Sequence, residues 1–138
     1  MGVEQLFGLL SVVLLFATLI VATTTDLMRR KVYNWTTYPA ICLGLALAFG
    51  AGGLDGSTAS AGLWNHLAGL AIGFSIFFIA HWAGGGVGGG DVKLVAAVGA
   101  IGGAPFIIGA IVWAGLVGAA MAIWALLWRG KLLKGMKR

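Results

Sequence analysis

Two aspartates, Asp26 and Asp91, are the residues of this chain whose type and placement suit acid–base chemistry. Each follows a long uncharged stretch and is followed closely by basic residues, and the chain holds only 4 acidic residues in all. Two neighbouring carboxyl groups that share one proton can work as a pair, because one accepts a proton from water while the other donates one. The two aspartates are therefore candidates for one catalytic site.

A glycine-rich run leads into the second aspartate. Six of the seven residues from Gly84 to Gly90 are glycine, and Asp91 follows at once. The run contains the G-x-G-x-x-G spacing of dinucleotide-binding loops, but no acidic residue follows Asp91 to bind the ribose of a dinucleotide. The G-K-[ST] ending of a phosphate-binding loop is also missing. Glycines without a Cβ instead let a peptide strand or a neighbouring helix come into contact with the aspartate.

The elements that must position these residues are membrane helices. The 138 residues are 60% hydrophobic and 9% charged, with a mean hydropathy of +1.01, which is too apolar for a soluble domain of this size. Uncharged stretches cover residues 5–25, 32–54, 56–90 and 94–128. Each is at least as long as the roughly 20 residues that a helix needs to cross a bilayer. Lipid is thus an expected partner, and nucleic acid is not.

Breaks within the uncharged stretches divide the chain into five expected helices. Small residues fill 56–62, glycine dominates 84–90, and Gly102 to Pro105 would end one helix and begin the next. Gly69/Gly73 and Gly99/Gly103 have the spacing that lets helices approach closely. We therefore predict an all-α polytopic membrane bundle that forms a single domain over residues 1–138. Its predicted segments are about 5–25, 36–52, 63–83, 92–104 and 105–128.

The distribution of charge predicts the orientation. Basic residues gather at 29–31 and in the tail 129–138, with Lys93 between them, and cytoplasmic loops collect such residues. An outside N-terminus with five crossings puts all 9 Lys and Arg residues, and the C-terminus, on the cytoplasmic side. Asp26 and Asp91 then meet the same face of the membrane.

Each aspartate also has a purely structural interpretation. Asp26 would close the first helix beside three threonines, and Asp91 would be the N-cap of the segment that it precedes. For one aspartate alone the two interpretations are equally good. Because ionisable groups at the edge of apolar segments are costly and usually functional, two of them on one face favour a shared site.

The residues around Asp91 resemble the G-x-G-D motif of the type IV prepilin peptidase family, which consists of intramembrane aspartyl proteases. In "GGGDVKLVAAVGAIGG" the two motif glycines correspond to Gly88 and Gly90, and Asp91 corresponds to a catalytic aspartate. Lys93 continues the family pattern, and it either orients Asp91 or reaches for the membrane interface as an ordinary lysine does.

The block "DLMRRKVYNW" resembles the first motif of the same family. Asp26 matches the first catalytic aspartate, and Asn34 matches the asparagine of the usual I-P-N ending. Val32 and Tyr33 stand where isoleucine and proline are usual, a departure that concerns the shape of this loop. The resemblance implies that Gly88, Gly90, Lys93 and Asn34 surround the substrate's approach to the aspartates.

The resemblance also implies an activity. It suggests a hydrolase of the bacterial cytoplasmic (inner) membrane that removes the leader of a prepilin or pseudopilin at the cytoplasmic face, for type IV pilus assembly or protein secretion. The single cysteine, Cys42, cannot build the zinc–cysteine region of the larger, methylating members. The chain is therefore similar to the short branch of tight-adherence (Flp) pilus systems, and no cofactor and no metal are expected.

Other interpretations stay open from sequence. A small glycine-rich transport or structural subunit could use Asp26 and Asp91 to bind protons or cations. His66 and His81 fall near opposite ends of one predicted helix, roughly 20 Å apart by helical rise, so they do not share a metal site. We expect capping or interface roles for both histidines.

Overall fold

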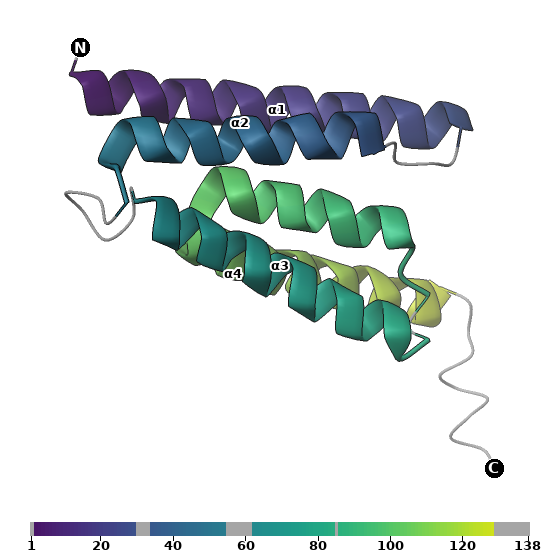
Figure 1. The fold of residues 1–138 in the computed structure, drawn as a ribbon. Coiled ribbons are helices and arrows are strands. Elements are labelled where there is room, and N and C mark those ends of the chain that lie inside the picture. Colours follow the sequence, from purple (N-terminus) through teal and green to yellow (C-terminus); the bar gives the residue numbers. More distant parts are fainter. Residues whose placement is uncertain (1, 30–33, 55–61, 85, 129–138) are drawn as a thin grey trace. The chain divides into compact units, whose positions relative to one another are not determined.

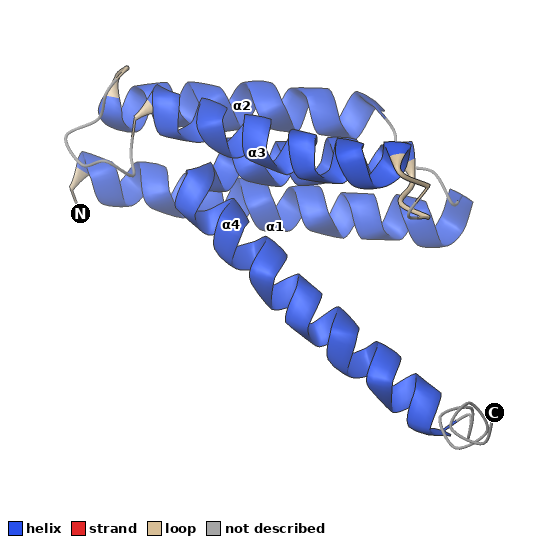
Figure 2. Ribbon diagram, turned by 90° about the horizontal axis from the view of Figure 1, so that it is seen from below, coloured by secondary structure: helices blue, strands red, loops and turns tan. Residues whose placement is uncertain are grey.

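The computed structural model describes residues 2–29, 34–54, 62–84 and 86–128. This part of the chain is helical and contains α1 (Val3–Arg29), α2 (Asn34–Gly52), α3 (Leu63–Trp82) and α4 (Gly89–Trp128), joined where described by turns and short loops (Figures 1 and 2). All four helices are long and apolar enough to cross a membrane. The predicted all-α fold is thus confirmed for the described residues, whereas the count of five crossings and the orientation stay predictions.

The chain forms two compact units, Met1–Ile108 and Gly109–Arg138. The first contains α1, α2, α3 and the first part of α4, and it carries every candidate site residue. In the second, residues 109–128 continue as helix. Within the first unit α1 packs against α2, and α2 packs against α3.

Helix α4 is two consecutive helices rather than one. Its backbone leaves the helical conformation at Gly103, where φ is 80° and ψ is 175°, a combination that essentially only glycine adopts. Pro105 follows within the first turn of the second helix, where its missing N–H leaves no hydrogen bond unmade. The break lies where the sequence predicts the boundary between the fourth and fifth segments.

Helix α1 runs four residues beyond its predicted end at residue 25 and stops at Arg29. The threonine hydroxyls bond to carbonyls of the preceding turn, with Thr24 Oγ1 donating to Val21 O at 3.1 Å and Thr25 Oγ1 donating to the same oxygen at 2.9 Å. Hydroxyls satisfied in this way do not compete for the helix's own N–H groups. Asp26 therefore lies inside the last turn of α1 and does not close the helix as the structural interpretation proposed.

The interior of the first unit is built from small residues that bring backbones together. A core of Ala40, Ala97 and Ile101 joins α2 to α4. A Cβ built on Gly69 of α3 would meet the carbonyl oxygen of Gly99 and the backbone of Gly103 in α4, so the two small-residue pairs face each other. Without an apolar driving force between helices in lipid, such close packing is what holds them together.

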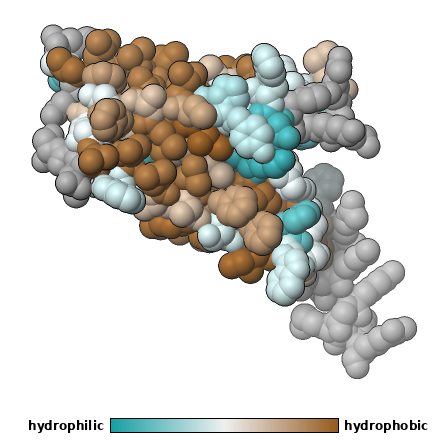
Figure 3. Space-filling model, viewed as in Figure 1, coloured by the Kyte–Doolittle hydropathy of each residue, from teal (hydrophilic) through white to brown (hydrophobic). Residues whose placement is uncertain are grey.

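Most of the outer surface is hydrophobic. On the face drawn in Figure 3, hydrophobic residues dominate, and hydrophilic surface gathers near the end where α1 stops and α2 begins. Large apolar side chains such as Val13, Phe16 and Ile20 of α1 are at least 60% exposed. Large apolar side chains exposed in this way suit lipid rather than water, as expected of an integral membrane protein.

Candidate active site

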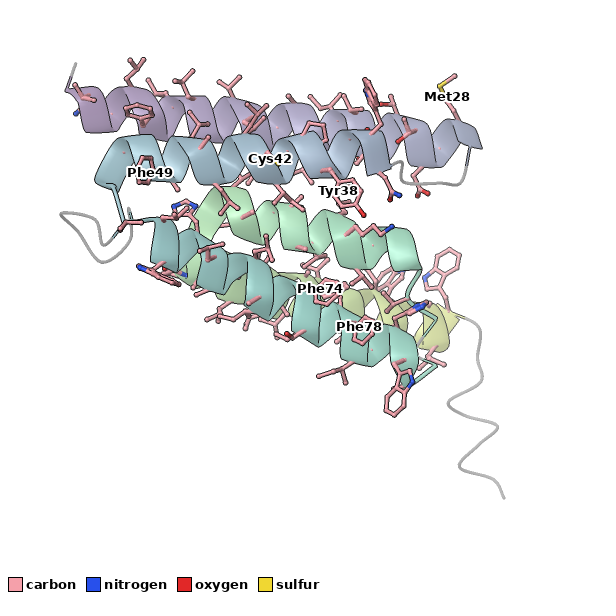
Figure 4. All side chains as sticks on the ribbon, in the orientation of Figure 1. Met28, Tyr38, Cys42, Phe49, Phe74 and Phe78 are labelled. Atoms are coloured by element: carbon pink, nitrogen blue, oxygen red, sulfur yellow. The ribbon has the colours of Figure 1, made fainter. Side chains whose placement is uncertain are left out.

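The residues predicted for the site lie at one end of the first unit. Asp26 is in the last turn of α1, Asn34 is the first residue of α2, and Asp91 is in the first turn of α4. Figure 1 shows these three helix ends on the same side of the first unit, and Figure 4 places the labelled Met28 and Tyr38 there as well. Both aspartates are exposed at this end of the unit.

A hydrogen bond joins the two motif blocks directly. Lys93 Nζ donates to Asn34 Oδ1 at 2.7 Å, across 59 residues of sequence. The contact ties the start of α4 to the start of α2, and Asp91 precedes Lys93 by two residues. The partner that the structure gives Lys93 is thus the asparagine of the first block. The positions 30–33, which include Val32 and Tyr33, lie outside the described residues.

Asp91 accepts a hydrogen bond from the backbone that precedes its helix. The Gly88 N–H donates to Asp91 Oδ2 at 3.1 Å, and the Gly88 carbonyl accepts from the N–H of Asp91 at 3.0 Å. Gly88 is therefore the N-cap and Asp91 is residue N3, whose side chain reaches back to the cap as in a capping box. The alternative interpretation of Asp91 as the N-cap is wrong, because α4 begins at Gly89 and not at residue 92.

The arrangement leaves part of the carboxylate available for chemistry. The N–H of Gly88 fixes Oδ2 and with it the orientation of the group, and within the described ranges Oδ1 has no hydrogen-bond partner. The negative charge also lies at the N-terminus of α4, where the helix dipole favours it. A carboxylate held by one oxygen and open at the other can accept a proton from a bound water.

The loop before α4 is held from the other side by a histidine. His81 Nδ1 donates to the carbonyl oxygen of Val87 at 2.6 Å. Gly84 and Gly86 in this loop have φ values of 76° and 72°, which L side chains rarely adopt, so the chain turns there only because these residues are glycine. The sequence places His81 at a helix end and assigns it a capping or interface role, without indicating this partner.

His66 belongs to the opposite end of α3. It is buried, and its Nδ1 donates to the carbonyl oxygen of Ala100 at 2.9 Å. Across the described part of the chain, no three His, Cys, Asp or Glu side chains gather as a metal site would require. The groups that the structure places at the candidate site are carboxylates, glycine backbone and one lysine–asparagine contact.

Comparison with known proteins identifies the family. The model of the type IV leader peptidase family (Peptidase_A24) matches residues 13–123, which include both aspartate blocks. The chain therefore belongs to the type IV leader peptidase family, and it is related to peptidases rather than to transport subunits. No curated protein and no solved structure matches the chain.

Two adjacent glycines provide a matched test of the cap geometry. A Cβ built on Gly88 would lie 3.2 Å from Asp91 Oδ2, whereas a Cβ on Gly89 would meet nothing within 4 Å. We expect Gly88→Ala to push the carboxylate aside and to lower kcat for leader cleavage about tenfold, because small displacements of a reacting group are costly. Gly89→Ala should stay within about twofold of the wild type, since an added methyl in open space disturbs no contact. Equal rates for the two variants would contradict this role of Gly88.

Proposed function

We propose that this protein is a membrane-embedded aspartyl endopeptidase that removes the leader peptide of prepilins or pseudopilins, with Asp26 and Asp91 as its catalytic pair. Membership of the leader peptidase family supports the reaction class. The Lys93–Asn34 hydrogen bond is the observation that carries the site, because it joins Asn34 of the first motif block to Lys93, two residues after Asp91. Asp26 lies in the last turn of α1, and Asp91 lies in the first turn of α4.

The proposed mechanism needs only the two carboxyl groups and water. One carboxylate accepts a proton as the water oxygen attacks the scissile carbonyl carbon, and the other carboxyl group donates its proton to the developing oxyanion. The tetrahedral intermediate then expels the amine, which takes up a proton from the pair, and the C–N bond breaks. The Gly88 N–H holds Asp91 in one orientation throughout, which reduces the entropy lost on reaching the transition state.

The substrate's path follows from the glycines. A scissile peptide must be extended for both carboxyl groups to reach it, and the segment 86–90 offers backbone with only one side chain, that of Val87. An extended leader could therefore lie against this loop and pair with its backbone. We place this site at the cytoplasmic face of a bacterial inner membrane, where the leader of a pilin precursor precedes its apolar helix. Within the family, we propose the tight-adherence (Flp) branch.

The test of the proposed function is a processing assay in membranes. The protein is co-expressed with a prepilin that carries a tag at its C-terminus, and the product is identified by gel mobility and by its intact mass. We expect a single new N-terminus, between the basic leader and the apolar helix. The assay is repeated with a panel of pilins and pseudopilins, so that the test does not depend on one substrate. If the protein is correctly inserted and the whole panel stays unprocessed, the proposal is contradicted.

A further inference from the structure

One peptide group connects His81 to Asp91. The carbonyl of Val87 accepts from His81 Nδ1 at 2.6 Å, and the N–H of Gly88 donates to Asp91 Oδ2 at 3.1 Å. This carbonyl and this N–H are the two ends of the same peptide bond. The imidazole and the carboxylate therefore bind opposite edges of one planar amide, and together they form a continuous chain of hydrogen bonds.

The direction of each bond in this chain is fixed by chemistry. A carbonyl oxygen can only accept, so Nδ1 of His81 carries the hydrogen, in either the neutral or the charged form of the ring. A donor on the carbonyl side draws electron density toward the oxygen and makes the N–H on the other side more acidic. Hydrogen bonds in such chains strengthen each other. His81 thus acts on the group that holds Asp91, although it does not touch Asp91.

Packing does not account for a histidine at this position. His81 is exposed, and so are its neighbours Trp82, Ala83 and Gly84. Among the described residues, the side chain is not part of the buried core. The contact that the structure gives this ring is the one to Val87, through an atom three bonds from Cα. What the position supplies is therefore a hydrogen-bond donor at a defined distance.

We propose that His81 is a positioning residue of the peptidase site, which orients the Asp91 carboxylate through the Val87–Gly88 peptide group. This inference rests on the proposed function for its kinetic consequence, but the hydrogen-bond chain itself is independent of it. The hydrogen bond from His81 fixes the orientation of the Val87–Gly88 peptide plane, and the Gly88 N–H in that plane fixes the position of Asp91 Oδ2. Oδ1 is thereby directed to the reacting water. His81 contacts neither substrate nor water in this role.

The kinetic test uses two amides that differ only in reach. The side-chain nitrogen of Asn is three bonds from Cα, as Nδ1 is, whereas that of Gln is one bond farther. In membranes that cleave prepilin, we expect His81→Asn to keep kcat within about twofold of the wild type. His81→Gln and His81→Ala should lower kcat about fivefold to tenfold, the effect of one lost hydrogen bond, with KM within about twofold. Equal kcat in all three variants, or equal loss in Asn and Gln, would overturn the proposal.

A second measurement needs no substrate and separates this inference from the proposed function. Labelling valine with ¹³C at the carbonyl and glycine with ¹⁵N selects the amides of Val87–Gly88, Val98–Gly99 and Val117–Gly118 in solution NMR of the full chain in detergent. We expect the signal of the Gly88 amide proton to move upfield in His81→Gln, because its hydrogen bond is weakened. In His81→Asn the signal should stay near its wild-type position.

The other two Val–Gly signals are the internal control, because both pairs belong to helix α4 and not to the loop that precedes it. A Gly88 signal that is the same in the Asn and Gln variants would show that the donor does not polarise this peptide, and it would overturn the inference even in a fully active enzyme. Conversely, the expected NMR shifts in a protein that cleaves no pilin would contradict the proposed function and leave the hydrogen-bond chain standing.

Discussion

Asp26→Asn and Asp91→Asn are each expected to lower the rate of leader cleavage by about a thousandfold or more, because the reaction needs both a proton acceptor and a proton donor. Asparagine keeps the size of the side chain but can neither take up the proton of the attacking water nor return one to the leaving amine. The measurement is the initial rate of prepilin processing in membranes, normalised to the amount of inserted protein.

The pair should also behave as one unit. The double variant is expected to be no slower than either single variant, since the loss of one partner already disables the other. Asp55→Asn is the matched control, because this aspartate belongs to the loop predicted on the outer face, and its activity should equal that of the wild type. Normal processing by either Asp26→Asn or Asp91→Asn would show that the proposed catalytic pair is wrong.

Gly69→Ala and Gly99→Ala are expected to have the largest effects on stability. A Cβ on either glycine would run into the backbone of the facing helix: at Gly69 it meets the Gly99 carbonyl oxygen, and at Gly99 it meets the Gly69 carbonyl oxygen. Backbone cannot rotate out of the way as a side chain can, so α3 and α4 must separate. We expect each change to cost about 3 kcal/mol of folding free energy, at the upper end for overpacked sites.

The measurement is unfolding of the purified protein in mixed micelles of rising SDS content, followed by circular dichroism and tryptophan fluorescence. Gly8→Ala is the control, because a Cβ there meets nothing within 4 Å. Alanine favours a helix over glycine by up to about 1 kcal/mol, so this variant should be as stable as the wild type or more so. If Gly69→Ala and Gly99→Ala unfold at the same SDS content as Gly8→Ala, the close approach of α3 and α4 is wrong.

The positions of the helices could largely be predicted from sequence, because membrane helices are recognised by the length and hydropathy of their segments. The break in α4 at Gly103 was equally readable, since glycine and proline determine backbone conformation locally. The helix ends were not. Thr25 and Asp26 look like a terminus in sequence, but the threonine hydroxyl bonds to its own helix, and α1 continues to Arg29.

The members of the candidate site were predictable from the two motif blocks, but their contacts were not. Asn34 and Lys93 were both candidates, yet a hydrogen bond across 59 residues depends on how α2 and α4 pack. His81 carried no sequence signal beyond its place at a helix end. Its bond to Val87 exists only because Gly84 and Gly86 turn the loop back, and such turns follow from φ values that a run of glycines permits without specifying.

The most direct test of the central claim, that Asp26 and Asp91 form one site, is the distance between them. In a Cys42→Ala background, Asp26→Cys/Asp91→Cys is treated in native membranes with a short bifunctional thiol reagent, and the intact mass shows whether one molecule bridges both thiols. Asn34→Cys/Lys93→Cys, whose native side chains are in contact, is the positive control, and Asp26→Cys/His66→Cys, at opposite ends of the unit, is the negative control. We predict that the 26/91 pair is bridged as the positive control is. Two separate adducts, as in the negative control, would contradict a shared site.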